Sequence, residues 1–420
     1  MKTFYIRTLG CKVNQCDSQE LRERFFKSGW DESPRGDQAD LCIVNTCCVT
    51  QHADRKSRAA IRDIVRRRAS GDSRIVVTGC YARYDRPAIE GIEGVDGIFE
   101  TNRKEELFKF LGDGSKGSPS ENLSLPCFAG RTRAFLKIQD GCDNRCSYCV
   151  VPTVRGPSRS KELSRVMDEA YRWVRAGHRE IVLTGVNLGS YGKDLSEEID
   201  LVGVIEALEK IKDLSRIRLS SIEAADITDK LIEKMAHSEK LCPHLHIPFQ
   251  SGDDHVLRGM NKRLSTKDYK VIVEKAKKNI KDLAITCDFI LGYPAEEEEN
   301  FQNTLKFIKF VAPLRTHIFT YSPRKGVSLE AKKTMPGENN AKKRFSQFKK
   351  VSDALSRDFK KQYIGRELEV LFEEEKGGSW LGFTKNYIKA SVTSHTPLRN
   401  MMTKVKITGI NSETVIAEIL

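Results

Sequence analysis

The apolar residues of this 420-residue chain follow two different periodicities, which divide it into three parts. Apolar runs of strand length alternate with helical stretches over residues 1–112 and again over residues 133–357. A Gly-, Ser- and Pro-rich segment, residues 113–132, separates these two parts and is typical of a linker. In residues 358–420, apolar and polar positions alternate in short runs, which is typical of β-strands. We therefore predict an α/β protein with a small β-rich domain at its C-terminal end.

The first part predicts repeated strand–helix units. Its three predicted strands are residues 2–9, 39–45 and 74–79. Leu21 and Phe25, four residues apart, predict a helix after the first strand, with Asp17 and Ser18 as its caps and Glu20 in its first turn. Consecutive units of this kind form a parallel sheet.

The second part contains six predicted strands, most of them separated by helical stretches. These strands are residues 134–139, 179–185, 216–221, 244–249, 284–292 and 316–322. Six units are fewer than the eight of a closed parallel barrel, so we expect a partial (βα)6 barrel with an open side. Active sites of such folds form at the C-terminal ends of the strands. Four consecutive acids at residues 296–299 predict an exposed helix start.

The third part predicts a small β-barrel of the OB kind. Its five strands are residues 366–375, 379–384, 387–394, 404–410 and 414–420. Such barrels often bind nucleic acid through a basic face that carries aromatic side chains. Trp380, Phe383 and Tyr387 are candidates for stacking on bases, and each would fit the barrel core equally well.

Composition and charge limit the partners of the protein. It is 39% hydrophobic and 31% charged, and its apolar runs stay below the ~20 residues that a membrane helix needs. Its first residues lack the apolar stretch of a secretory signal, so we expect a cytoplasmic protein whose twelve cysteines are metal ligands or buried thiols. The net charge of +13 favours nucleic acid as a partner. Residues 331–363 and Arg55 to Arg68 carry much of it, although either could be a solvated helix face.

Cys142, Cys146 and Cys149, here called the barrel triad, are the sharpest chemical signal. Three thiols within eight residues would leave one iron of a 4Fe–4S cluster without a protein ligand, and chemistry can occur at such an open position. The triad directly follows the first strand of the predicted barrel, at its active-site mouth. Zinc is the alternative, with Cys127, Cys242 or a nearby His as the fourth ligand, but the first gap of three residues is unusual for a zinc knuckle.

Cys11, Cys47 and Cys80, here called the sheet triad, are a second signal. Each follows one of the first three strands, and they are 36 and 33 residues apart. Because parallel strands end at one edge of a sheet, the three loops converge there. A second three-thiolate metal site is the better interpretation, and the alternative is that Cys42, Cys47, Cys48 and Cys80 are ordinary buried thiols.

Several motifs together resemble the radical S-adenosylmethionine (SAM) methylthiotransferase family. The barrel triad with Tyr148 before its last cysteine matches the radical SAM motif. The other matching motifs are TLGCKVNQ around Cys11, NTC around Cys47, TGCYAR around Cys80 and VVPTVRGPSRS at residues 150–160. Residues 358–420 resemble a TRAM domain, which is an RNA-binding β-barrel. The resemblance covers essentially the whole chain in the family's domain order.

The resemblance implies an enzyme with two 4Fe–4S clusters, and with SAM as radical source and methyl donor. The barrel triad would hold the cluster that binds SAM, and the sheet triad would hold the cluster that carries the sulfur. The sequence around Cys11 and Cys47 is most similar to the branch that adds a methylthio group to C2 of N6-threonylcarbamoyladenosine at tRNA position 37. The implied partners are tRNA, a sulfur donor and an electron donor such as flavodoxin or ferredoxin.

The resemblance also implies SAM contacts at the strand ends of the barrel. The candidates are Tyr148, Thr184, Gly185, Asn187, Ser221, Glu223, Ile290 and Gly292. For each glycine the alternative is that it only permits a turn. His246 matches a family stretch and could equally be structural, and Arg155 and Arg159 could bind phosphate, the SAM carboxylate or acidic neighbours.

Two cysteines depart from the family pattern. Cys48 stands where Thr is expected, and Cys16 stands where an aromatic residue is more usual, so either could compete as a ligand or handle sulfur. The cysteines that match no motif are expected to be structural: Cys127, Cys242 and Cys287.

Three other functions are alternatives to this one. The same chemistry could act on isopentenyladenosine in tRNA or on a ribosomal protein, although a net charge of +13 would repel a basic protein substrate. A non-enzymatic RNA-binding protein with structural metal would leave the open iron positions unexplained.

Overall fold

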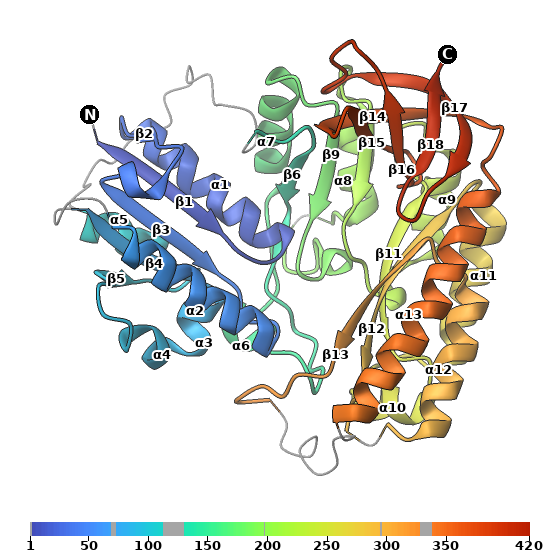
Figure 1. The fold of residues 1–420 in the computed structure, drawn as a ribbon, viewed down its shortest axis with the longest axis horizontal. Coiled ribbons are helices and arrows are strands. Elements are labelled where there is room, and N and C mark those ends of the chain that lie inside the picture. Colours follow the sequence, from blue (N-terminus) through green and yellow to red (C-terminus); the bar gives the residue numbers. More distant parts are fainter. Residues whose placement is uncertain (1, 69–72, 112–129, 197, 295, 328–337) are drawn as a thin grey trace.

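The computed structural model describes residues 2–68, 73–111, 130–196, 198–294, 296–327 and 338–420 (Figure 1). An N-terminal sheet, a partial barrel and a C-terminal closed barrel follow one another along the chain. Most of the predicted linker lies outside the described residues, and so does Cys127. Among the described helices, none is both long and apolar enough to cross a membrane.

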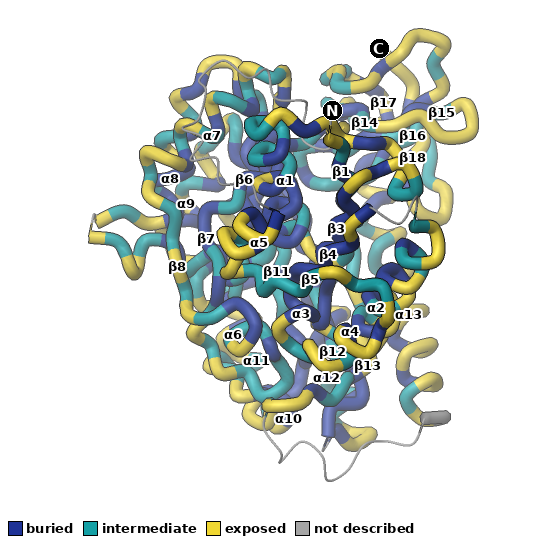
Figure 2. The backbone as a smooth tube through the Cα atoms, turned by 90° about the vertical axis from the view of Figure 1, so that its left-hand side faces the viewer, coloured by how far each residue is buried: buried dark blue, intermediate teal, exposed yellow. Residues whose placement is uncertain are grey.

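The N-terminal sheet has the strand order β2-β1-β3-β4-β5, and all its pairs are parallel. The strands are β1 Thr3–Thr8, β2 Asp31–Glu32, β3 Leu41–Thr46, β4 Arg74–Gly79 and β5 Gly97–Ile98. The helices are α1 Lys12–Lys27, α2 Gln51–Arg66, α3 Cys80–Tyr84, α4 Arg86–Glu90 and α5 Lys104–Phe110. β3 and β4 are almost wholly buried (Figure 2), as expected for apolar central strands of a parallel sheet.

The prediction for the start of α1 is wrong. The helix begins at Lys12, and Cys11 is at its N-cap position. Asp17 and Ser18 are buried within the helix instead of capping it. The Asp17 carboxylate accepts a hydrogen bond from Arg155 at 2.9 Å, so its polar group serves a tertiary contact.

The partial barrel is built from two parallel three-stranded sheets, β10-β9-β6 and β11-β12-β13. Bridges between Ile217 and Leu241 and between Ser221 and His246 join the two halves. The strands are β6 Ala134–Lys137, β9 Glu180–Thr184, β10 Arg216–Leu219, β11 His244–Gln250, β12 Ala284–Leu291 and β13 Arg315–Thr320. The N-terminal sheet lies beside this barrel, with α1 against β6 (Figure 1).

Helices cover the outside of the partial barrel. They are α7 Leu163–Arg175, α8 Leu201–Glu209, α9 Asp229–His237, α10 Asp254–Gly259, α11 Thr266–Asn279, α12 Glu298–Val311 and α13 Glu338–Lys361. The short helix α6 Val151–Arg155 packs instead against α3 of the N-terminal domain. A short antiparallel pair, β7 Gln139–Asp140 and β8 Arg159–Ser160, was not predicted. The predicted exposure of residues 296–299 is wrong for Glu296, which is buried and accepts a hydrogen bond from Arg344 of α13 at 3.0 Å.

The C-terminal strands close into a barrel with the order β14-β15-β16-β18-β17. They are β14 Glu367–Lys376, β15 Ser379–Thr384, β16 Lys389–Thr393, β17 Met402–Ile410 and β18 Val415–Ile419. Trp380 is buried in the barrel core, and Tyr387 stacks on Phe383 and on His244 of β11, with ring centroids 4.8 and 4.4 Å apart. The three aromatic side chains therefore serve the core and the domain contact rather than an open surface for bases.

Buried arginines fix this barrel to the partial barrel. Arg216 is fully buried and donates hydrogen bonds to the backbone carbonyls of Phe383 and Glu369, both at 2.9 Å. Arg218 donates to the backbone carbonyl of Lys385 at 2.8 Å, and within its own domain it pairs with the buried carboxylate of Glu180 at 2.6 Å. Because separating the barrels would leave these buried guanidinium N–H groups without partners, the contacts to the carbonyls hold the two domains in one relative position.

Candidate active site

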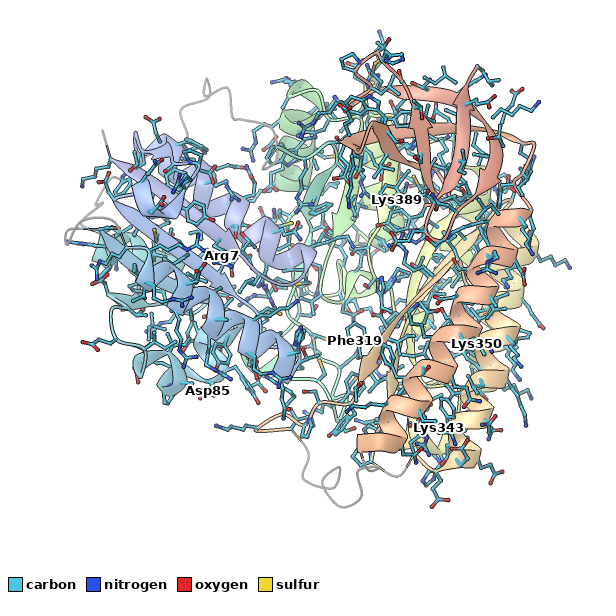
Figure 3. All side chains as sticks on the ribbon, in the orientation of Figure 1. Arg7, Asp85, Phe319, Lys343, Lys350 and Lys389 are labelled. Carbon is cyan, nitrogen blue, oxygen red and sulfur yellow. The ribbon has the colours of Figure 1, made fainter. Side chains whose placement is uncertain are left out.

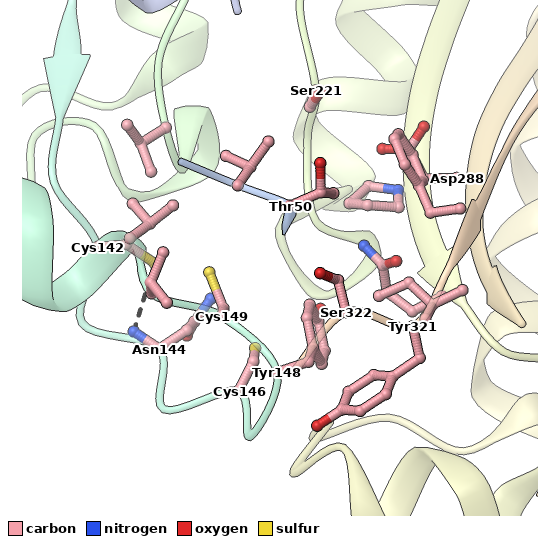
Figure 4. A pocket seen from close by; sticks show the side chains of 18 of the residues that line it. Thr50, Cys142, Asn144, Cys146, Tyr148, Cys149, Ser221, Asp288, Tyr321 and Ser322 are labelled. Atoms are coloured by element: carbon pink, nitrogen blue, oxygen red, sulfur yellow. Dashed lines mark hydrogen bonds between the residues drawn. The ribbon is translucent and has the colours of Figure 1, made fainter. Parts of the chain in front are cut away.

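The barrel triad occupies the loop between β7 and α6, at the C-terminal end of β6. Gly141 makes the loop tight: its φ is +72°, and a Cβ there would lie 1.9 Å from the carbonyl oxygen of Pro157. The Cys142 amide donates to the carbonyl of Gly156 at 3.1 Å, which anchors the start of the loop. Figure 4 shows the three sulfur atoms beside one cavity. Burial, with the neighbouring thiols, raises the pKa of Cys149 to about 12.

The cavity has a volume of about 310 Å³ and lies between the two α/β domains. The barrel triad forms one wall, Asp288 and Ile290 of β12 with Phe319 of β13 contribute to another, and Val49 and Thr50 of the N-terminal domain border it. Several aliphatic side chains also line it: Val49, Val150, Val151, Val186 and Ile290. Such a lining excludes water from a reactive species.

Five of the eight predicted SAM contacts line this cavity, and they are Tyr148, Asn187, Ser221, Glu223 and Ile290. The other three are not among the residues that line it. Thr184 donates its hydroxyl hydrogen to the carbonyl of Val182, and Gly185 leaves room for the Gln139 side chain, which a Cβ would approach to 2.9 Å. Gly292 donates its amide to the carboxylate of Glu296 at 2.6 Å. These three residues support the strand ends.

Asn187 and Glu223 supply polar groups to the cavity. The Oδ1 atom of Asn187 is buried without a hydrogen-bond partner among the described residues, whereas its Nδ2 donates to Ser190. An unpaired buried acceptor is costly unless a ligand donor reaches it. Glu223 accepts from Lys262 at 2.5 Å. A second cavity of about 410 Å³ shares Asn187, Glu223 and Cys146 with the first.

The sheet triad is assembled by the topology of the N-terminal sheet. Cys11, Cys47 and Cys80 follow β1, β3 and β4, which lie side by side and run in the same direction. Asn14 ties their loops together, because its amide donates to the carbonyls of Leu9 and Thr46 at 2.8 Å each. The prediction that the three loops converge is confirmed.

A glycine keeps space free beside the sheet triad. Gly10 has a φ of +97°, and a Cβ there would lie 2.8 Å from the sulfur of Cys47. The thiols of Cys11, Cys47 and Cys80 influence one another electrostatically. A hydrogen bond from Cys48, helped by the charge of Arg155, lowers the pKa of Cys80 to about 7. Burial raises the pKa of Cys11, and that of Cys47 to about 12, so the fit to a second cluster rests on three thiols brought to one place and not on their pKa values.

The remaining cysteines differ in their distance from the sheet triad and in their hydrogen-bond partners. Cys48 is fully buried and its thiol is hydrogen-bonded to that of Cys80, so it borders the sheet triad. Cys16 is buried on the other side of α1 and donates to the carbonyl of Phe135 at 3.5 Å. Cys242 and Cys287 are also buried.

Arg155 and Arg159 behave differently from each other. Arg155 is buried and pairs with Asp17 and Asp140, both at 2.9 Å, so acidic neighbours account for it. It also donates to the side-chain oxygen of Asn14 at 2.5 Å. Arg159 is exposed and donates to the carbonyl of Arg155.

Three features of the site were not found from the sequence. Val49 borders the cavity although no motif marks it. Lys137 joins the Arg155 network through Asp17, 120 residues away in the chain. Asp288 joins His246 and His317 from neighbouring strands. The strand alternation places His246 and Asp288 in the barrel but does not show that they touch.

Comparisons with known proteins agree with this geometry. Residues 3–100 match the model of the uncharacterized protein family UPF0004, and residues 136–308 match the radical SAM superfamily. The chain is 35% identical to the threonylcarbamoyladenosine tRNA methylthiotransferase MtaB of Bacillus subtilis, over 97% of this chain and 94% of the relative. This chain belongs to the radical SAM methylthiotransferase family. Two further relatives carry the names of two different branches of this family.

The protein named MtaB in Thermotoga maritima is 34% identical, over 93% of this chain and 91% of the relative. A tRNA-2-methylthio-N(6)-dimethylallyladenosine synthase of Acetivibrio thermocellus is 32% identical, over 89% of this chain and 81% of the relative. Among solved structures, the radical SAM methyltransferase TsrM from Kitasatospora setae shares the fold, with a TM-score of 0.55, 13% identity and coverage of 76% of this chain and 75% of that chain.

The protein is therefore a radical SAM tRNA methylthiotransferase with two 4Fe–4S clusters and SAM as cofactors. When bound, these groups supply the radical that activates a carbon–hydrogen bond and the sulfur that replaces the hydrogen. The chain's own residues would bind and orient these groups and the substrate. The two cysteine triads would hold the clusters, Asn187 would offer an acceptor, and the aliphatic lining would keep water from the reacting atoms.

Proposed function

We propose that this enzyme adds a methylthio group to C2 of N6-threonylcarbamoyladenosine at tRNA position 37. The observation that carries the proposal is the 35% identity with the Bacillus subtilis relative of that name over 97% of the chain. Relatives named for dimethylallyladenosine match at 32% over 89% of the chain, as in Acetivibrio thermocellus. Identity thus favours the threonylcarbamoyl branch, whereas coverage does not separate the two branches, because another dimethylallyladenosine synthase also covers 97% of this chain.

The six triad cysteines are the proposed cluster ligands. The cavity supports a role for one cluster in SAM binding and for the other in sulfur supply. Val49 and Thr50 follow the sheet-triad residue Cys47 in sequence, and they border the same cavity as the barrel triad. A nucleoside bound there would meet both clusters. Tyr148, Asn187, Ser221, Glu223 and Ile290 are the proposed SAM contacts, and Thr184, Gly185 and Gly292 would support the strand ends that carry them.

Charge supports tRNA as the substrate. Lys343 and Lys350 lie along α13, and Phe319 lies between that helix and the N-terminal sheet (Figure 3). A net charge of +13 favours a polyanion and disfavours a basic ribosomal protein. The TRAM-like closed barrel is a further proposed RNA contact. A reductant such as flavodoxin or ferredoxin and a sulfur donor are the remaining proposed partners.

A deletion strain tests the substrate directly. Bulk tRNA from the strain is digested to nucleosides and measured by mass spectrometry. We expect the methylthiolated threonylcarbamoyladenosine to disappear and its unmethylthiolated precursor to accumulate. Loss of methylthiolated isopentenyladenosine instead would assign the enzyme to the other tRNA branch. Persistence of the expected product, in a strain with no second enzyme that makes it, would overturn the proposal.

A further inference from the structure

Asp288 forms a polar cluster with two histidines on the neighbouring strands of the partial barrel. His246 of β11 lies 3.1 Å from its carboxylate through Nε2, and His317 of β13 lies 3.0 Å from it through Nδ1. Although burial raises the pKa of Asp288, the hydrogen bonds from the two histidines overcome that effect and lower it. Asp288 lines the cavity, and Figure 4 shows it across from the barrel triad.

The two histidines differ in whether a ring nitrogen remains available for a ligand. His246 uses both ring nitrogens, because its Nδ1 lies 2.8 Å from the hydroxyl of Thr286. His317 uses only Nδ1, and its Nε2 has no hydrogen-bond partner within the part of the chain that the structure describes. The side chain of His317 is also 49% exposed, against 13% for His246. Of the three, Asp288 lines the cavity, whereas His317 lies beside it and is the histidine with a ring nitrogen free to bind a ligand.

An exposed aromatic side chain lies next to this histidine. Residues two apart on a strand point to the same side, so Phe319 shares the face of His317 on β13. Phe319 is 39% exposed and borders the cavity, and so does Val49, which is 49% exposed, on the N-terminal domain. Two exposed apolar side chains at one cavity form a rim that suits a flat base.

The chemistry of the proposed substrate matches this arrangement. In adenine, N1 separates C2 from C6, which carries N6. When C2 faces the barrel triad, the N6 substituent extends away from it, toward the wall that carries Asp288. A threonylcarbamoyl group has a carboxylate, a hydroxyl and ureido N–H groups, all of which need polar partners once they leave water. A dimethylallyl group is a hydrocarbon and would leave His317 and Asp288 without a ligand.

We propose that His317, held in place by Asp288, binds the threonyl carboxylate of the target nucleoside, and that Phe319 stacks on its base. This inference rests on the proposed function and explains how the site would select it. In the bound state, Nδ1 of His317 faces Asp288 and Nε2–H donates to the threonyl carboxylate, so the ring lies between two carboxylates. Asp288 alone would repel that carboxylate, and His317 therefore decides the selection.

Binding of short RNAs to the cluster-loaded enzyme tests the proposal. Anticodon stem-loops are prepared with threonylcarbamoyladenosine, isopentenyladenosine or plain adenosine at position 37, and their Kd values are measured by fluorescence anisotropy under anaerobic conditions. We expect His317→Leu to weaken binding of the threonylcarbamoyl loop about ten- to a hundredfold, the range of a charge-assisted hydrogen bond. Binding of the plain loop should not change. His317→Gln, which keeps an amide donor, should recover part of the loss.

His237→Leu is the matched control, because His237 is an exposed histidine on the outer helix α9. It should leave all three affinities unchanged. If the parent enzyme itself prefers the isopentenyl loop, the proposed function fails. If it prefers the threonylcarbamoyl loop and His317→Leu keeps that preference, the function stands and this inference is overturned.

Two other ligands of the cluster can be recognised in the same preparations. His246, Asp288 and His317 have the donor atoms for a metal ion, and these atoms lie within 4.8 Å of one another. One equivalent of a divalent ion that is lost in His317→Leu but kept in His237→Leu would assign the cluster to metal. A weaker affinity for SAM in His317→Leu, measured by equilibrium dialysis, would assign it to the cofactor. Either result would overturn the proposal.

The proposed stacking of Phe319 on the base is tested separately, with the same three RNAs. Phe319→Ala should weaken all three loops by a similar factor of about five to a hundred, the range of one stacked base, because stacking does not depend on the N6 group. Phe345→Ala is the control, since Phe345 is 36% exposed on α13. Equal effects of the two substitutions, or a loss confined to one loop, would contradict a stacking role for Phe319.

Discussion

The two cysteine triads would hold the same kind of cluster, but the chain builds them in different ways. The barrel triad lies on one loop of eight residues, and all three side chains are partly exposed. The sheet triad spans 70 residues from Cys11 to Cys80, and two of its members are buried. A local loop can present its thiols before the domain is complete. The sheet triad exists only when β1, β3 and β4 have paired.

Their electrostatic surroundings differ as well. The sheet triad lies beside Arg155, whose positive charge acts on Cys11 and Cys80. Arg155 belongs to the central domain and follows Cys149 of the barrel triad by six residues. The second site thus depends on a side chain supplied by the domain of the first. The reverse dependence is weaker, because Glu223 and Lys262 near the barrel triad both come from the central domain.

The largest expected effect comes from removing one ligand from each triad. Cys149→Ala should abolish SAM cleavage and methylthio transfer together, because the radical source is lost. Cys80→Ala should abolish methylthio transfer yet keep SAM cleavage. Iron should fall from about eight to about four atoms per chain in both variants, as expected for two cubane clusters. The assays are iron content and the 5′-deoxyadenosine formed on reduction. Loss of both activities in Cys80→Ala would show that the triads are not independent.

Arg155→Met should give the next largest effect, on stability. It leaves the buried carboxylate of Asp17 without one of its cations, and breaking a buried pair costs about 3–5 kcal/mol. Urea denaturation at neutral pH measures the loss. Arg159→Met is the matched control, because this exposed arginine bonds only to the carbonyl of Arg155 among the hydrogen bonds described, so its effect should stay below about 1 kcal/mol. Similar losses in both variants would contradict a special role for Arg155.

The same network predicts how stability depends on acidity. Although burial raises the pKa of Asp17, the charges of Lys104, Lys137 and Arg155 outweigh it and hold the pKa well below its ordinary value. A carboxyl whose pKa is lowered by folding stabilises the protein above its unfolded pKa of about 3.9, and this contribution is lost as the pH falls through the folded value. Unfolding free energy should therefore decline below about pH 4, and less steeply in Arg155→Met than in the parent.

The two triads also show what the sequence can predict. The barrel triad is visible from spacing alone, and the sheet triad follows from strand ends, because parallel topology brings those ends together. The role of Asp17 could not be predicted, since its partners Lys137 and Arg155 are 120 and 138 residues away. A polar residue near a helix start is normally a cap, and tertiary pairing replaced that local preference here.

The same limit applies elsewhere. Glu296 stands in a run of acids that predicts an exposed helix start, but Arg344 of α13 provides a buried partner. Trp380 has the alternating pattern of a strand, which does not show whether its side faces the core or the solvent until the barrel closes. Side chains that meet across distant segments are determined by packing, which a single sequence does not display.

A smaller effect is expected from the glycine beside the sheet triad. Gly10→Ala places a Cβ 2.7 Å from the Cβ of Cys47 at a φ of +97°, so the Cys47 loop must shift. We expect iron to fall toward about four atoms per chain while SAM cleavage continues. Gly29→Ala is the control, because its φ is +77° but nothing lies within 4 Å of the added Cβ. It should cost about 1–2 kcal/mol of strain and no iron. Iron loss in both variants would indicate general unfolding.

The smallest effect distinguishes a neighbour of the sheet triad from a ligand. The hydrogen bond from Cys48 is the largest contribution that lowers the pKa of Cys80 to about 7. Cys48→Ala removes this donor, so the pKa of Cys80 should rise and its thiolate fraction at neutral pH should fall. The alkylation rate of Cys80 in cluster-free protein should drop about three- to tenfold, with Cys42→Ala as the control because Cys42 bonds to the carbonyl of Gly36 instead. Iron in the reconstituted variant should stay near eight atoms per chain, since Cys11, Cys47 and Cys80 remain. A fall to about four would make Cys48 a ligand, and the sheet triad would then differ from the barrel triad in composition as well as in construction.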